Sequence, residues 1–264
     1  MAIVEPSRRP VGHLLRGWRE QRRLSQLDLA LQADISTRHL SFVENGRAAP
    51  SREMLLHLAE RLELPLRERN HLLLAAGYAP VYSESPLDSP RLSAVRAAVR
   101  QILAGHEPYP AVVIDRHWQL VEMNASVGLF LTGVAPALLA PPANVLRVSL
   151  HPQGMAPRIA NLGEWRGHLL GRLRRQIALT ADVDLGRLYD ELRAYPGDQS
   201  TPDAEIPGPE EIIIPLRLRH EGGELAFIST VATFGTPLDI TVAELAIESF
   251  FPADARTAAA LRGE

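Results

Sequence analysis

The sequence predicts two domains, an all-α domain of five helices followed by an α+β domain with a five-stranded antiparallel sheet. Three observations predict this. Capped helical segments fill the chain as far as Ala76. The segment 78–90 contains three prolines and several serines, which is typical of a linker. Strand-like segments occur only after it. We therefore expect a helical domain at 1–80, a linker at 81–91 and a second domain at 92–264.

Composition excludes several kinds of chemistry. The chain has 264 residues, of which 46% are hydrophobic, so two domains with real cores are possible. It has no cysteine, which excludes disulfides, thiol nucleophiles and cysteine–zinc sites. It also has no lysine, which excludes a lysine Schiff base, a phosphate-loop lysine and a Ser-Lys dyad. No apolar run reaches the length of a membrane span, and the N-terminus lacks a signal-peptide core, so we expect a cytoplasmic protein without a membrane partner.

Charge is distributed unevenly along the chain. The formal net charge is −3, and every basic residue is an arginine. Residues 1–80 contain 12 arginines and 9 acidic residues, whereas the remainder contains 16 arginines and 22 acidic residues. The first domain is therefore positive and the second negative. A positive first domain is what binding to phosphate requires.

The five expected helices of the first domain are placed by their caps. Ser25 caps one helix and can form a capping box with Asp28, and Ser36 caps the next. Asp34 lies in the turn between them. The other helices are expected at 12–23, 51–62 and 66–76, and the four arginines of the first of these are expected on an exposed basic face: Arg16, Arg19, Arg22 and Arg23.

The segment from Gln26 to Arg47 carries a family resemblance. Gln26, Ala30, Ile35, Leu40 and Val43, followed by Glu44-Asn45-Gly46-Arg47, resemble the helix-turn-helix of the phage-repressor or XRE family. The family usually has glycine in the turn where this chain has Asp34, a residue that tolerates the left-handed backbone. The resemblance implies that the second helix enters the DNA major groove. An ordinary helical hairpin is the alternative interpretation.

The resemblance also suggests which side chains contact DNA. Thr37 and Arg38 would read base edges, and arginine suits guanine in particular. Asn45, Arg47 and Arg52 would contact phosphates, while Gln26 would contact a phosphate and brace the recognition helix. The full set of expected DNA-binding residues is Gln26, Ser36, Thr37, Arg38, His39, Ser41, Asn45, Arg47 and Arg52.

The second domain is expected to alternate helices and strands. Helices are predicted at 92–104, 125–131, 161–179, 184–194 and 252–262. Strands are predicted at 110–115, 119–124, 212–219, 224–234 and 240–248, with helices on one face of the sheet. We expect 144–152 to be a connecting segment and 196–209 to be a surface loop.

The opening of this domain carries a second resemblance. A hairpin that runs into a helix after Asn124 is how a PAS-type sensor domain begins. Asp115, Trp118 and Asn124, in the pattern D-x-x-W-x-x-x-x-x-N, resemble the start of the MmyB-like ligand-binding domain. That domain follows an XRE-type helix-turn-helix in a large family of bacterial regulators. The resemblance implies a pocket for a small apolar molecule, such as a fatty acid.

Apolar and polar residues of the second domain are candidates for this pocket. Five polar residues could anchor a carboxylate, namely Arg147, His151, Asn161, His168 and Arg172. Arg172 could instead belong to a solvated helix face, which is the commoner position for a run of charges. For each apolar residue, ordinary core packing is the alternative. The expected ligand-binding residues are Ile114, Met123, Phe130, Arg147, Trp165, His168, Leu169, Arg172, Phe227 and Phe234.

Catalytic patterns are missing from the sequence. The nine histidines show no metal-ligand spacing, there is no G-x-S-x-G motif or glycine-rich phosphate loop, and Glu210-Glu211 fits the start of a strand. We expect neither an enzyme nor a cofactor. The expected function is a homodimeric transcriptional regulator of a pseudo-palindromic operator, whose ligand changes the dimer arrangement. The alternative is a regulator whose second domain binds a protein partner.

Overall fold

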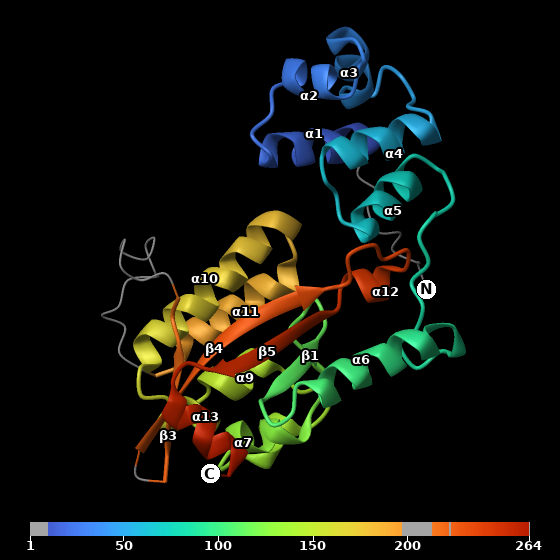
Figure 1. Ribbon diagram of the computed structural model, residues 1–264. Helices are drawn as coiled ribbons and strands as arrows, with labels where there is room; N and C mark the ends of the chain where they lie inside the picture. The colour runs from blue at the N-terminus through green and yellow to red at the C-terminus, as the bar shows by residue number, and fades with distance from the viewer. Residues whose placement is uncertain (1–9, 197–212, 222, 264) are drawn as a thin grey trace, which may run out of the picture. The chain divides into compact units, whose positions relative to one another are not determined.

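The computed structural model describes residues 10–196, 213–221 and 223–263 (Figure 1). The chain forms two compact units. Unit 1 contains the chain as far as Pro86 together with 236–243, and unit 2 contains 87–235 and 244–264. The chain therefore passes from one unit to the other three times.

Unit 1 is entirely helical. Its helices are α1 Val11–Gln21, α2 Gln26–Gln32, α3 Thr37–Glu44, α4 Arg52–Arg61, α5 Leu66–Ala75 and the short α12 Ile240–Ala243. The Ser25 side chain accepts a hydrogen bond from the backbone of Asp28 in the expected capping box, and Ser36 and Ser51 cap α3 and α4. These caps place the start of each helix. The core is formed by leucines that are completely buried, among them Leu15, Leu29, Leu40, Leu58 and Leu73.

Two backbone positions fix the geometry around α3. Asp34 has a φ of +49° in the turn between α2 and α3, as the sequence predicted. Gly12 of α1 lies against the end of α3, where an added Cβ would stand 2.4 Å from the carbonyl oxygen of Val43. Any larger residue at this position would therefore push α1 away from α3.

Unit 2 is built on one antiparallel sheet. The strands are β1 Ala111–Ile114, β2 Leu120–Met123, β3 Leu216–His220, β4 Gly223–Thr233 and β5 Ala246–Pro252, in the spatial order β2-β1-β5-β4-β3. The α-helices are α6 Ser93–Gly105, α7 Gly128–Leu131, α8 Pro136–Leu139, α9 Val145–Leu150, α10 Leu162–Thr180, α11 Val183–Ala194 and α13 Ala255–Arg262. Single 3₁₀ turns occur at Pro90–Leu92, Ala125–Val127 and Ala156–Arg158. The expected fold class, five helices followed by an α+β domain with a five-stranded antiparallel sheet, is confirmed.

Helices cover both faces of this sheet rather than one (Figure 1). The inner face packs against α9, α10 and α11 in the main core. The outer face packs against α6, whose Val99 and Leu103 contact Val113 and Ile247 in a smaller core. The prediction of helices on one face was wrong because adjacent residues of β1, Val112 and Val113, point to opposite faces and are both buried.

Two other segments differ from the sequence-based expectation. The segment 144–152 contains α9, because the Asn144 side chain accepts hydrogen bonds from the backbone nitrogens of Leu146 and Arg147 and caps a helix. The predicted strand 240–248 begins instead as α12, and β5 starts at Ala246. Residues 197–212 lie outside the described residues, and with them most of the expected loop at 196–209, the pair Glu210-Glu211 and the first residue of the expected strand 212–219.

None of the helices in the described part of the chain combines the length and the apolar character needed to cross a membrane.

Candidate functional site

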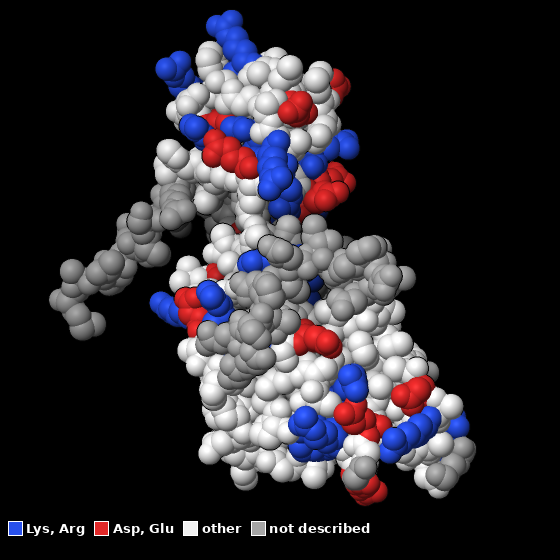
Figure 2. Space-filling model, turned by 90° about the vertical axis from the view of Figure 1, so that its left-hand side faces the viewer, with Lys and Arg blue, Asp and Glu red and all other residues white. Residues whose placement is uncertain are grey.

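Six of the nine expected DNA-binding residues lie on α3 or at its two caps. Figure 2 shows basic side chains projecting from the end of unit 1 that carries α2 and α3, at the top of the view. Ser36, Arg38, Asn45, Arg47 and Arg52 are exposed, and the remaining four are half-buried: Gln26, Thr37, His39 and Ser41.

The basic side chains on this surface are not neutralised within unit 1. Arg38, Arg47 and Arg52 form no ion pair with any residue that the structure describes. The guanidinium of Arg38 lies 5.3 Å from the ring centroid of Phe42, one turn along α3. This contact holds an exposed arginine on the helix surface without using its hydrogen-bond donors.

Glu44, at the end of α3, ties this helix to two other helices. Its buried carboxylate accepts hydrogen bonds from Nε and Nη2 of Arg19 on α1, at 2.7 and 2.9 Å, and from Nε2 of Gln26 on α2, at 2.7 Å. The hydrogen bonds to Glu44 raise the pKa of Arg19. The prediction that Arg19 is exposed was wrong, because it pairs with a carboxylate 25 residues away. The side chain of Gln26 thus contacts the end of α3.

A cavity of about 80 Å³ lies in unit 2 between the inner face of the sheet and the helices that cover it. Its wall is apolar except for two side chains, Ser149 of α9 and Glu248 of β5. Glu248 lies two residues before the lining residue Phe250, so both point to the same face of the sheet. Unit 2 therefore contains an apolar cavity with few polar groups, as is usual for small-molecule sites.

The structure brings three of the expected ligand-binding residues together around the cavity, namely Phe130, Trp165 and Leu169. Ile114 and Phe227 are buried in the same core without lining it, and the ring of Phe227 packs edge-on against Phe130. His168 stacks on Trp165, and Arg172 reaches the wall through Glu248.

The other three expected residues lie elsewhere in unit 2. Met123 is exposed at the end of β2, and Phe234 packs against the outer core. Arg147 forms a two-point ion pair with Glu191 of α11, at 2.8 and 2.7 Å. Hydrogen bonding to Glu191 raises the pKa of Arg147, and burial followed by contact with Glu191 raises the pKa of Tyr195 to about 12.

Several lining residues were not among the candidates. Trp118 belongs to the D-x-x-W pattern, which was a signal that could have identified it. Other lining residues carried no sequence signal of their own, among them Leu146, Ser149, Met155, Glu248 and Phe250.

The turn between β1 and β2 holds Trp118 in place. The Asp115 carboxylate accepts hydrogen bonds from the backbone nitrogens of His117 and Gln119, at 2.8 and 2.9 Å, which folds the turn. Trp118 has a φ of +63°, which is unfavourable for a large side chain. Its indole nitrogen donates a 2.8 Å hydrogen bond to Gln176 of α10. The motif therefore serves to bring an indole ring to the cavity wall.

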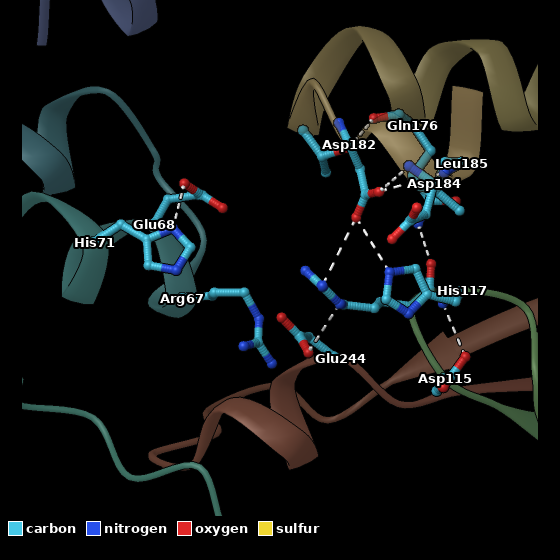
Figure 3. A network of polar contacts seen from close by, with 12 residues as sticks. Arg67, Glu68, His71, Asp115, His117, Gln176, Asp182, Asp184, Leu185 and Glu244 are labelled. Atoms are coloured by element: carbon cyan, nitrogen blue, oxygen red, sulfur yellow. Dashed lines mark hydrogen bonds and ion pairs between the residues drawn. The ribbon is translucent and has the colours of Figure 1, made fainter. Parts of the chain in front are cut away.

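The same turn is tied to the start of α11 (Figure 3). The Asp182 carboxylate accepts hydrogen bonds from the backbone nitrogens of Asp184 and Leu185 and lies 3.2 Å from Nε2 of His117. Although burial opposes it, these contacts lower the pKa of Asp182. The turn that carries Trp118 is thus fixed to both helices of the α10–α11 hairpin.

Two basic side chains of α10, Arg172 and His168, flank the cavity wall. Arg172 of α10 donates from Nη1 to Oε1 of Glu248 at 2.9 Å, and its guanidinium lies 4.7 Å from the Trp118 ring centroid. Burial, and then the nearby charges of Arg172 and Arg175, lower the pKa of His168 to about 4. His168 is therefore neutral at physiological pH.

The connection from β4 to β5 belongs to unit 1. The buried carboxylate of Asp239 accepts hydrogen bonds from the backbone and hydroxyl of Ser85 and from the backbone of Thr241. The Ile240 backbone nitrogen donates to Ser83, and the Ile240 side chain is buried. The neighbouring residues Val81 and Tyr82 are held in turn by the side chain of Asn70 on α5.

The described residues were also compared with the arrangement that a metal site requires. Among the residues that the structure describes, no group of histidine, aspartate and glutamate side chains is arranged to hold a metal ion.

Comparison with known families covers most of the chain. The sequence model described as the MmyB-like transcription regulator ligand binding domain matches residues 95–263, and the one described as helix-turn-helix matches residues 15–69. Both describe domains of transcription regulators rather than enzymes. No curated protein matches the chain.

Proposed function

Because the chain belongs to the MmyB-like transcription regulator ligand-binding family and carries an XRE-type helix-turn-helix, it is a DNA-binding regulator, and we propose that it senses a small apolar molecule. The observation that carries the proposal is the cavity of unit 2, whose wall is apolar except for Ser149 and Glu248. A concave apolar space with few polar groups is a typical ligand site.

Size limits what the cavity can hold. Its volume of about 80 Å³ exceeds the roughly 10–15 Å³ that one water molecule needs but is below the ~300 Å³ at which ordinary ligand pockets begin. The ligand is therefore short, or its apolar chain widens the cavity as it enters.

A fatty acid is one candidate for this molecule. Its chain matches the apolar wall, but its carboxylate needs a cationic or hydrogen-bonding partner. Arg147 is already paired with Glu191, and His168 is neutral. Arg172 is the remaining candidate, and a fatty acid would have to compete with Glu248 for it.

On DNA, we propose a homodimer in which each copy places α3 in one major groove of a pseudo-palindromic operator. Thr37 and Arg38 read bases, because they lie at the N-terminal end of α3 and Arg38 has no ion pair within the described chain. Asn45, Arg47 and Arg52 contact phosphates. A cytoplasmic location is part of the proposal.

The route from ligand to DNA runs through β5. This strand supplies Glu248 and Phe250 to the cavity wall, and the segment that leads into it, 236–243, is hydrogen-bonded to Ser83 and Ser85 within unit 1. A ligand that shifts β5 would shift this segment as well. The ligand changes operator affinity only if its own affinity differs between the two arrangements.

Binding of a protein partner is the second candidate function. Leu179 and Val183, at the junction of α10 and α11, are 54% and 67% exposed. Apolar side chains exposed next to each other are found at protein–protein contacts. This function would use the outer surface of unit 2 instead of the cavity.

Native mass spectrometry of the purified protein, followed by denaturing extraction, tests the proposal. We expect a dimer that carries a small molecule, which is released on denaturation. The matched control is Ala143→Leu, which enlarges a side chain of the cavity wall and should abolish the bound mass while the protein stays folded. A dimer without bound mass, together with a partner protein that copurifies through Leu179 and Val183, would favour the second function.

A further inference from the structure

Glu248 is unusual in the wall of an apolar cavity. It is 4% exposed, and a buried carboxylate is costly unless it is paired and hydrogen-bonded. Within the described chain, its hydrogen-bond partner is Arg172, whose Nη1 lies 2.9 Å from Oε1. Its second oxygen, Oε2, forms no hydrogen bond with a described residue. Since an ionised carboxylate only accepts hydrogen bonds, the wall offers an acceptor that the protein leaves open.

Arg172 holds this acceptor in place through an ion pair. Its guanidinium is held between the Glu248 carboxylate and the ring of Trp118, 4.7 Å from the ring centroid. The side chain of Arg172 is 18% exposed and that of Glu248 is 5% exposed, so water screens the pair weakly. The two charges cancel, and the wall gains a hydrogen-bond acceptor without a net charge.

Ser149 is the other polar group of the wall. Its Oγ accepts a 3.0 Å hydrogen bond from the indole nitrogen of Trp165. No described residue accepts a hydrogen bond from its hydroxyl, which can therefore still donate one. A molecule bound in the cavity thus meets a strong acceptor at Glu248 and a weak donor at Ser149.

Given the proposed ligand site, we infer that Glu248 selects an uncharged ligand, an apolar molecule with one hydrogen-bond-donating group such as an alcohol. The ligand donates its hydrogen bond to Oε2 of Glu248. A carboxylate in the same position would stand beside a like charge, and an ammonium group would stand beside Arg172. An ether or a hydrocarbon would leave the buried oxygen without a donor, which is costly in an apolar site.

Three probes of similar length separate these cases, namely octanol, methyl heptyl ether and octanoate. Binding to the full chain is measured by isothermal titration and by tryptophan fluorescence, because Trp118 and Trp165 both line the cavity. We expect octanol to bind more tightly than the ether and octanoate, by about tenfold or more. In Glu248→Gln, which keeps an oxygen for Arg172, octanoate should bind about tenfold more tightly than in the wild type.

Glu224→Gln is the matched control. It removes the same charge from a side chain on β4 that pairs with Arg217 and does not line the cavity, so the order of the probes should not change. If octanoate binds the wild type as tightly as octanol, the inference about Glu248 is overturned, although the cavity remains a ligand site. This comparison needs no variant, so it decides the question even if Glu248→Gln does not fold.

Failure of the proposed function gives a different result. In that case none of the three probes binds the wild type, or each binds Ala143→Leu as tightly as the wild type. Either result places binding outside the cavity and overturns the inference together with the proposed function.

Discussion

Trp118 shows how much one residue contributes to unit 2. Its backbone is held in the left-handed region at a cost of roughly 1–3 kcal/mol. In return, its indole donates to Gln176, its ring contacts Arg172, and its surface lines the cavity. Asp115 folds the turn that makes this possible. The D-x-x-W pattern is therefore explained by packing and hydrogen bonding around the proposed site.

Arg38 tests the proposed DNA contact at the scale of one residue. Arg38→Ala should weaken specific operator binding by about 1–3 kcal/mol and relax the preference at one base pair. Arg61→Ala is the control, since it removes an exposed arginine at the end of α4, away from α3. Fluorescence anisotropy on an operator selected in vitro measures both. Unchanged affinity and base preference in Arg38→Ala would show that α3 does not read bases through this residue.

The lowered pKa of His168 predicts that the free energy of unfolding depends on pH. Burial and the charges of Arg172 and Arg175 lower its pKa from 6.5 to about 4 in the folded protein. As the pH falls from 6.5 toward 4, the unfolded chain takes up a proton that the folded protein does not, so the free energy of unfolding decreases. Because His168 is only half-buried and solvent screens its charge, we expect a loss of about 1 kcal/mol.

Urea unfolding at neutral and mildly acidic pH measures this effect against His168→Gln. The variant should lose less stability than the wild type over the same interval. Equal losses in the two proteins would mean that His168 titrates in the folded state as it does in the unfolded chain.

At the scale of elements, the ends of α3 are set by nearby residues, whereas its packing is set by residues distant in the sequence. Its start and end follow from Ser36 and Asn45, and both could be predicted because caps act over three or four residues. Its attachment through Glu44 to Arg19 and Gln26 joins three helices, and nothing in the local sequence indicates which arginine is buried. The same limit applies to 240–243, where contacts with Ser83 and Ser85 accompany a helix in place of the expected strand.

The β4–β5 connection can be tested as an element. Asp239→Ala removes the acceptor for three hydrogen bonds from Ser85 and Thr241. Hydrogen exchange in 236–243 should become faster by about tenfold or more, since each lost bond to a buried charged group costs roughly 1–3 kcal/mol. Asp88→Ala, an exposed acidic residue in the linker region, is the control and should leave exchange unchanged. Equal protection in both variants would show that Asp239 does not hold this connection.

For the whole molecule, the sequence was sufficient to predict two domains of the right class and, through two motifs, their families. It placed Phe130, Trp165 and Leu169 in the lining because large apolar residues at strand and helix spacing point inward. It could not place Glu248, because the strand boundary near residue 246 decides which face each residue of β5 occupies. The same limit explains the errors at Met123 and Phe234. Both were expected to bind the ligand, but Met123 is exposed and Phe234 packs in the outer core.

The central claim is that occupation of the cavity changes operator affinity. The most direct measurement is operator binding by the full chain with and without the molecule released from the purified protein, or octanol where none is released. We predict a change of about 5–150-fold in the wild type and no change in Ala143→Leu. If tryptophan fluorescence shows the cavity filled while operator affinity stays the same, the claim that unit 2 controls DNA binding through its ligand is contradicted.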